Sequence, residues 1–183
     1  MDAGNCHFVF LDTNLYGREM KKQIEWLRQD LAQDDHAWKI AVFHHPPFSS
    51  FNRGVNPNVT DTVLPTLYYY GVDLILAGHD HHYVRTKPIT DEKGRSIISL
   101  VCGGGGAPLY PAYKKKFTAV SEKVHHALFL TVGPKKISGK AVDPKGNMID
   151  TFIFEKELMK EYARKGIPAA KIIAGLDLAT RAE

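Results

Sequence analysis

The feature that most constrains this chain is an apolar run that ends in a glycine and a group of histidines, LILAGHDHHYVR, at residues 74–85. The apolar run predicts a buried β-strand, and Gly78 allows the chain to turn sharply where the strand ends. His79 and His81 follow two positions apart, so their side chains can point to the same side of an extended or tightly turned loop. Two imidazoles in this arrangement suit one or two metal ions.

A second apolar run, residues 40–43, ends in His44 and His45, and two prolines then prevent the strand from continuing. A single histidine is more often a surface or hydrogen-bonded core residue than a ligand. Five of the nine histidines nevertheless fall in these two short clusters. This clustering favours a metal site made by His44, His79 and His81 and leaves the roles of His45 and His82 open.

Strand and helix patterns alternate through the first half of the chain. Strands are predicted at residues 7–11, 39–43 and 72–77, and helices at residues 16–33 and 59–70, where Pro65 predicts a kink or a late start. Two strand–helix–strand units in series predict parallel strands and therefore an α/β fold, a mixed sheet with flanking helices. Ligands of such sheets gather beyond the carboxyl ends of the strands, where both histidine clusters lie.

The second half of the chain has a different pattern, with strands in succession and a hairpin turn at residues 143–147, which predicts antiparallel or mixed pairing. The loop at residues 46–58 is rich in polar residues, glycine and proline, and is expected to be an exposed connection over the site. The tail at residues 155–183 is expected to form one or two helices with a break at residues 166–168. The predicted strands are residues 96–102, 125–132, 135–142 and 148–154.

Charge and composition exclude several partners. The net charge of +4 is compatible with an anionic substrate, but the basic residues are dispersed apart from residues 114–116, so no nucleic-acid partner is expected. No run is long enough to span a membrane and no signal peptide is visible, which predicts a soluble chain of undetermined compartment.

Cys6 and Cys102 fit no zinc motif, and their disulfide state is open. Four glycines after Cys102 could cradle a phosphate, but the Lys-Ser/Thr of a P-loop is absent, and a flexible loop bordering the cleft is favoured.

A strand followed by H-x-P, and a later block G-H-x-H-x-Y-x-R carried by Gly78, His79, His81, Tyr83 and Arg85, resemble the carboxyl-terminal portion of a calcineurin-like metallophosphoesterase of the purple acid phosphatase-like branch. The resemblance implies the carboxyl-terminal half of a four-layer α/β/β/α sandwich over residues 1–154, with residues 155–183 as a helical tail outside it.

The resemblance also implies hydrolysis of phosphate esters at a dinuclear centre of Fe, Mn or Zn ions. His44 and His79 would bind one metal ion and His81 the other. His45 would hydrogen-bond the phosphate or act as the catalytic proton donor, and Tyr83 and Arg85 would support the ligands or fix the substrate loop.

Three upstream motifs that supply aspartate and asparagine ligands in this family do not occur in the sequence. The expectation is therefore a fragment that begins after the third motif and belongs to a longer parent protein that holds both metal ions. The alternative is a catalytically incompetent fragment that binds at most one ion or serves as an interaction domain. A half-fold of this kind would expose a sheet face and could self-associate through it.

Overall fold

A mixed β-sheet forms the centre of the computed structural model, which describes residues 1–51, 55–159, 161, 166–170 and 173. Within these residues the central sheet has nine strands, in the order β1-β2-β3-β4-β7-β5-β8, with β6 beside β7 and β12 beside β6. The strands are β1 (Asp2–Ala3), β2 (Cys6–Leu11), β3 (Trp38–Phe43), β4 (Leu74–Ala77), β5 (Tyr83–Thr86), β6 (Ile89–Thr90), β7 (Ser96–Cys102), β8 (Thr118–Glu122) and β12 (Ile167–Pro168).

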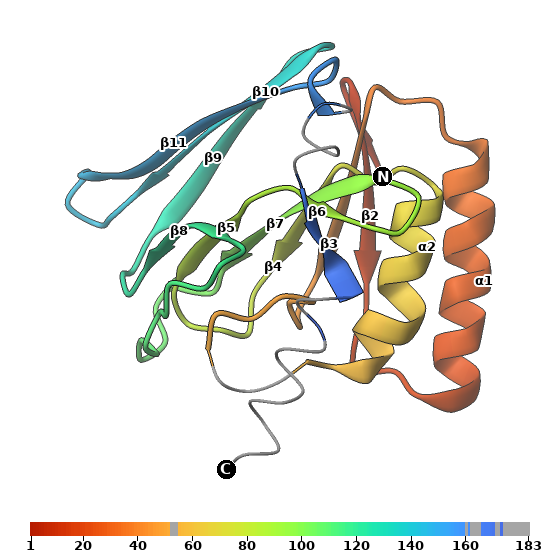
Figure 1. The fold of residues 1–183 in the computed structure, drawn as a ribbon, viewed down its shortest axis with the longest axis horizontal. Helices are drawn as coiled ribbons and strands as arrows, with labels where there is room; N and C mark the ends of the chain where they lie inside the picture. Colours follow the sequence, from red (N-terminus) through yellow and green to blue (C-terminus); the bar gives the residue numbers. More distant parts are fainter. Residues whose placement is uncertain (52–54, 160, 162–165, 171–172, 174–183) are drawn as a thin grey trace.

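Two further layers cover the central sheet on opposite faces (Figure 1). Helices α1 (Gly17–Gln33) and α2 (Leu64–Tyr69) cover one face, and α2 continues directly from the π-helical segment η1 (Val59–Val63). The antiparallel strands β9 (Ala127–Val132), β10 (Lys136–Val142) and β11 (Met148–Glu155) form a second sheet on the other face. The described residues therefore form an α/β fold with a mixed sheet and flanking helices, as the sequence predicted.

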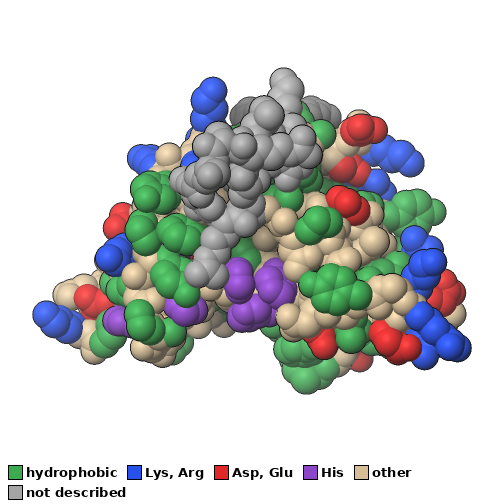
Figure 2. All heavy atoms as spheres, turned by 90° about the horizontal axis from the view of Figure 1, so that it is seen from below, with side chains coloured by type: hydrophobic (Ala, Val, Ile, Leu, Met, Phe, Trp, Pro, Cys, Tyr) green, Lys and Arg blue, Asp and Glu red, His purple; other side chains and the backbone are tan. Residues whose placement is uncertain are grey.

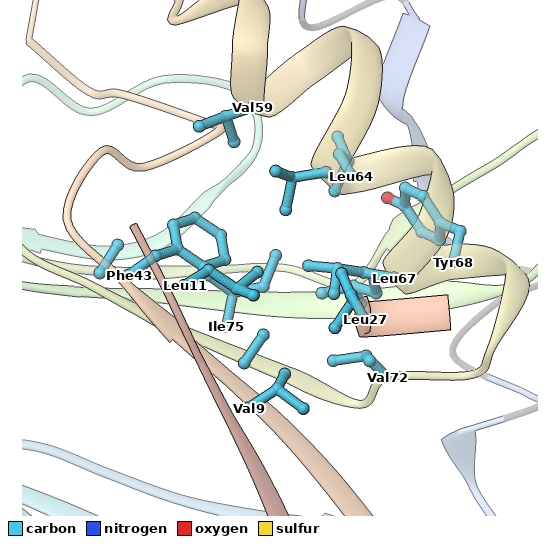
Figure 3. Close-up of a cluster of buried hydrophobic side chains, with 14 of the residues drawn as sticks. Val9, Leu11, Leu27, Phe43, Val59, Leu64, Leu67, Tyr68, Val72 and Ile75 are labelled. Carbon is cyan, nitrogen blue, oxygen red and sulfur yellow. The ribbon is translucent and has the colours of Figure 1, made fainter. Parts of the chain in front are cut away.

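The core between the helices and the central sheet follows from apolar spacing in the sequence. Helix α1 buries Met20, Ile24, Leu27 and Leu31, which lie three or four positions apart and share one face of the helix. They form one cluster with side chains from the sheet, from η1 and α2, and from the turn after α2. Of these, Figure 3 labels Val9, Leu11, Phe43, Val59, Leu64, Leu67, Tyr68, Val72 and Ile75. Pro65 lies in the first turn of α2, so the late start expected for this helix is observed.

The core between the two sheets depends on alternating burial in the smaller one. Strand β10 buries Ile137, Gly139 and Ala141 in alternation, and its neighbour β11 buries Phe152 and Phe154. The indole of Trp38 donates a 2.8 Å hydrogen bond to the carbonyl of Gly133 across the same interface. The smaller sheet is thereby fixed against the face of β3.

The parallel register aligns the ends of the strands that carry the histidines. Leu11 pairs with Phe43, and Phe43 pairs with Ala77, so β2, β3 and β4 end in one row. The residues that follow these three strands leave the sheet at the same edge. The edge that His44 and His79 share is called the carboxyl edge below.

The loop and the tail depart from the sequence predictions in two places. Residues 46–50 are buried rather than exposed, because Phe48 enters the core and the hydroxyls of Ser49 and Ser50 have polar partners inside the protein. The predicted break at residues 166–168 is non-helical, and it contains the short strand β12, which was not predicted and which pairs in parallel with β6. Most of the helices predicted in residues 155–183 lie outside the described residues. Among the described residues, no helix has the length and apolar character needed to cross a membrane.

Candidate metal centre

Two histidines converge at the carboxyl edge because they follow adjacent parallel strands. His44 comes directly after β3, and His79 follows β4 after the single residue Gly78, whose amide donates a 3.1 Å hydrogen bond to the carbonyl of His44. The Nδ1 of His79 lies 3.1 Å from the Nε2 of His44, and the two ring centroids are 5.0 Å apart. Figure 2 shows histidine side chains gathered on the face toward which these strands point.

His45 completes a group of three imidazoles. One ring nitrogen from each of His44, His45 and His79 lies within 4.8 Å of the others, and His45 is 4.6 Å from His79 between ring centroids. Three imidazole nitrogens at this separation fit the donor set of a Zn, Fe or Mn ion after small side-chain rotations. The structure therefore brings two of the three predicted ligands together and adds the residue predicted as the catalytic acid.

The backbone at His79 has an unusual conformation. Its φ angle is +64°, in the left-handed region that costs a residue with a Cβ about 1–2 kcal/mol. Short hydrogen bonds hold the turn in place, from the amide of Asp80 to the carbonyl of Gly78 (2.7 Å) and from the amide of His82 to the carbonyl of Asp80 (2.8 Å). Strain of this kind is characteristic of residues placed for function.

His81 lies apart from the three-histidine group. Its Nδ1 donates a 2.9 Å hydrogen bond to the carbonyl of Pro108, and its ring stacks on Tyr110 at 4.2 Å. Because a carbonyl only accepts hydrogen bonds, Nδ1 carries the proton and the lone pair is on Nε2. A backbone carbonyl that fixes the tautomer in this way is the usual support of a metal-binding histidine.

Thr13 positions His45 and was not identified from the sequence. It is fully buried, its Oγ1 lies 2.7 Å from the Nδ1 of His45, and it accepts a 3.3 Å hydrogen bond from the backbone amide of the same residue. Burial lowers the pKa of His45 below its usual value, and the neighbouring His79 and His44 lower it further. The imidazole is therefore neutral near pH 7 and keeps a lone pair for binding.

The histidine loop alternates between half-buried and fully buried residues. Asp80 and His82 are fully buried, whereas His79 and His81 are half-buried. Ser49 donates a 2.5 Å hydrogen bond to Asp80 Oδ2, and the hydroxyl of Ser50 lies 3.0 Å from the Nε2 of His82. His82, whose role the sequence left open, therefore connects the histidine loop to the buried serine loop.

Tyr83 and Arg85 do not reach the histidines but hold the strand that follows them. The hydroxyl of Tyr83 donates to Asp150 Oδ2 at 2.8 Å, and Arg85 donates to both carboxylate oxygens of Asp150, at 2.7 and 3.1 Å. Asp150 belongs to β11 of the smaller sheet. These residues thus fix β5, and with it the end of the histidine loop, to the second sheet.

The glycine-rich run after Cys102 lies against the histidine loop. A Cβ at Gly103 would overlap the backbone carbonyl of Asp80, and a Cβ at Gly104 would come within 2.5 Å of His126 and of the carbonyl of Val124. These glycines therefore permit two backbones to approach closely. This geometry explains Gly103 and Gly104 without a bound phosphate.

Gly103→Ala should reduce stability by about 1–3 kcal/mol and weaken metal binding, because the new methyl group must displace the turn that carries His79 and His81. Gly105→Ala is the matched control, since a Cβ at Gly105 meets no atom within 4 Å. Chemical unfolding and a Zn²⁺ titration of both variants measure the effect. Equal stability and equal Zn²⁺ affinity of the two variants would contradict the close contact between Gly103 and the histidine loop.

A cavity of about 350 Å³ opens beside His45 and His79. Its walls combine aromatic, proline and neutral hydrogen-bonding side chains with one buried carboxylate. Such a cavity can receive the organic part of a substrate whose reacting group sits at the histidines. It is lined by Tyr16, His45, Pro46, Ser49, Val55, Asn56, Pro57, Asn58, His79 and Asp80.

Residues 5–83 match the family model described as calcineurin-like phosphoesterase, and the matched segment contains all the histidines at the carboxyl edge. Over these residues the chain is similar to the calcineurin-like phosphoesterases. Purple acid phosphatase 15 of Arabidopsis thaliana is 32% identical over 112 residues, which are 57% of this chain and 21% of that protein. Purple acid phosphatase 21 of the same plant is 30% identical over 130 residues, 66% of this chain and 30% of that protein.

Two solved structures show a similar fold. The purple acid phosphatase PPD1 from yellow lupin (Lupinus luteus) superposes with a TM-score of 0.73 at 22% identity, covering 85% of this chain and 32% of that one. GAP50, the anchor in the inner membrane complex of Plasmodium, superposes with a TM-score of 0.69 at 21% identity, covering 86% and 54%. This chain thus spans less than a third of the length of each of these three purple acid phosphatases.

Proposed function

We propose that this chain supplies part of a metal-dependent phosphoesterase site that hydrolyses phosphate esters. The observation that carries the proposal is the convergence of His44, His45 and His79 at the carboxyl edge, beside a cavity large enough for a substrate group. The relationship to purple acid phosphatases favours this chemistry over other uses of a histidine cluster.

The proposed centre is dinuclear and belongs to the complete parent protein. His44 and His79 would bind one metal ion, and His81, which lies apart from them with its Nε2 lone pair available, would bind the second. Fe, Mn or Zn ions held here would lower the pKa of bound water and stabilise charge on the phosphoryl group. Thr13 places His45 to hydrogen-bond the phosphate, or to donate a proton to the leaving group once its imidazole has been protonated.

Phosphatase activity with a chromogenic phosphate ester tests this proposal on the purified chain. Turnover that appears only after Mn²⁺, Zn²⁺ or Fe²⁺ is added, and that is lost on chelation, would establish a competent site in these residues. Elemental analysis of the same dialysed sample counts the ions. Two ions with turnover would support a dinuclear centre, and turnover that is unaffected by chelation would rule out metal chemistry.

The second candidate function is an interaction domain that binds at most one ion. It is favoured by the donor set: among the described residues, the close group at the carboxyl edge contains imidazoles and no carboxylate. GAP50, which has a similar fold, is described as the anchor in the inner membrane complex of Plasmodium, so an anchoring protein can have this fold. Metal binding without turnover would support this candidate, and sedimentation at increasing concentration tests the proposed self-association through a sheet face.

A further inference from the structure

A second group of metal-binding side chains lies at the opposite edge of the central sheet. His7 is the second residue of β2 and pairs with Asp2 of β1. Asp30 lies in the last turns of α1, Asp34 caps that helix, and His36 precedes β3. His7 is four residues from the end of β2, which places this group about 13 Å along the strand from the carboxyl edge. These five residues are called the amino-edge cluster.

The side chains of the cluster already surround one small volume. The Nδ1 of His7 lies 2.6 Å from Asp2 Oδ1 and 3.6 Å from Asp34 Oδ1, and the Nδ1 of His36 lies 2.5 Å from the same Asp34 oxygen. Ligand atoms of Asp2, His7, Asp34 and His36 all lie within 4.8 Å of one another. Ligands of a tetrahedral zinc ion are about 3.4 Å apart, so small rotations suffice.

The other nitrogen of His7 has the partner that a metal-bound imidazole requires. Its Nε2 lies 2.7 Å from Asp30 Oδ2, and His7 is only 8% exposed. A carboxylate that accepts the second ring N–H of a histidine fixes the tautomer and raises the basicity of the nitrogen that faces the metal. Asp30 is therefore placed to orient His7 with Nδ1 toward the ion.

Asp34 is the most buried carboxylate of the cluster. Its side chain is 3% exposed, whereas those of Asp2 and Asp30 are 59% and 26% exposed. Its Oδ2 forms an ion pair with Lys39 Nζ at 3.3 Å, and its Oδ1 faces His7 and His36. A buried carboxylate is costly unless cations pair with it, and an ion on the Oδ1 side would add to the pairing that Lys39 supplies on the other side.

We propose that Asp2, His7, Asp34 and His36 bind a zinc ion, with Asp30 as the positioning residue behind His7. Two imidazoles and two carboxylates complete a four-ligand set, and four protein ligands leave no open position, as in a closed structural site rather than a catalytic one. The ion joins the amino-terminal hairpin β1-β2 to the end of α1 and to the loop before β3. Its role is to stabilise the fold, independently of the chemistry proposed at the carboxyl edge.

Zinc titration of whole-chain variants separates the two sites. His44→Ala/His79→Ala should retain one Zn²⁺ per chain by calorimetry and should unfold at a higher temperature when Zn²⁺ is present. His7→Ala/His36→Ala should lose that ion and the zinc-dependent rise in unfolding temperature, while the carboxyl-edge histidines stay intact. An unchanged rise in the second variant, or no zinc bound by the first, would overturn the proposal.

Asp30→Asn keeps all four ligands and the shape of the positioning residue. It therefore tests the site even if the His7→Ala/His36→Ala variant fails to fold. It should weaken zinc binding about 10–100-fold, the usual effect of losing a carboxylate behind a metal-bound histidine. Co²⁺ added to the His44→Ala/His79→Ala variant should give the intense visible bands of a four-coordinate ion. Unchanged zinc affinity in Asp30→Asn, or a cobalt spectrum of the octahedral aqueous ion, would count against the site.

Discussion

Asp150→Ala should lower the free energy of unfolding by about 3–5 kcal/mol, the range expected when one partner of a buried ion pair is removed. The carboxylate is 8% exposed and accepts hydrogen bonds from Tyr83 and from two nitrogens of Arg85. Its removal leaves a guanidinium and a hydroxyl between the two sheets without their acceptor. Urea unfolding of the variant and of the original chain measures the difference.

Two matched variants show whether the charge pair or the packing is responsible. Tyr83→Phe removes one neutral donor and should cost only about 1 kcal/mol. Asp150→Asn keeps the shape but removes the charge, so it should fall between the alanine variant and the original chain. A loss for Asp150→Ala no larger than for Tyr83→Phe would show that Arg85 finds another partner or water. The sheets would then be held together chiefly by the apolar core.

Local sequence patterns were sufficient to predict the central part of the fold. The apolar spacing of Leu27 and Leu31 predicted α1, and the strand predicted at residues 96–102 is β7 itself. The approach of His44 and His79 was also predictable, because adjacent parallel strands end in one row. In each case the signal lies within a few residues of the structure it determines.

The features that the sequence did not reveal depend on contacts between distant residues. Strands β5 and β8 are short, and their apolar residues show no clear period, so only pairing with β7 and with each other defines them. Thr13 reaches His45 across 32 positions, and Asp150 reaches Arg85 across 65. The amino-edge cluster also joins Asp2 and His7 to residues beyond α1. A single threonine, aspartate or histidine has no surrounding sequence pattern from which such a distant partner could be predicted.

Under the proposed function, His79→Ala should lower the metal-dependent hydrolysis of a phosphate ester by at least about 100-fold, because loss of a direct ligand exceeds the 10–100-fold effect of losing a residue that only supports one. The Nδ1 of His79 lies 3.1 Å from the Nε2 of His44, and His45 belongs to the same close group. The alanine variant therefore leaves two of the three imidazoles of this group. The assay uses the chromogenic ester and the metal ion that gives the highest rate in the original chain. His125→Ala, which changes a histidine outside this group, should keep full activity.

His79→Gly separates the loss of the ligand from the strain of the backbone. Both variants lack the imidazole, but glycine adopts the observed φ of +64° freely, whereas alanine keeps the cost of a Cβ in the left-handed region. The glycine variant should therefore be about 1 kcal/mol more stable than the alanine variant, and equally inactive. If the strained turn serves to aim His79 at the metal, neither variant recovers activity. Recovery in the glycine variant alone would mean that the turn, and not the imidazole, is what the reaction requires.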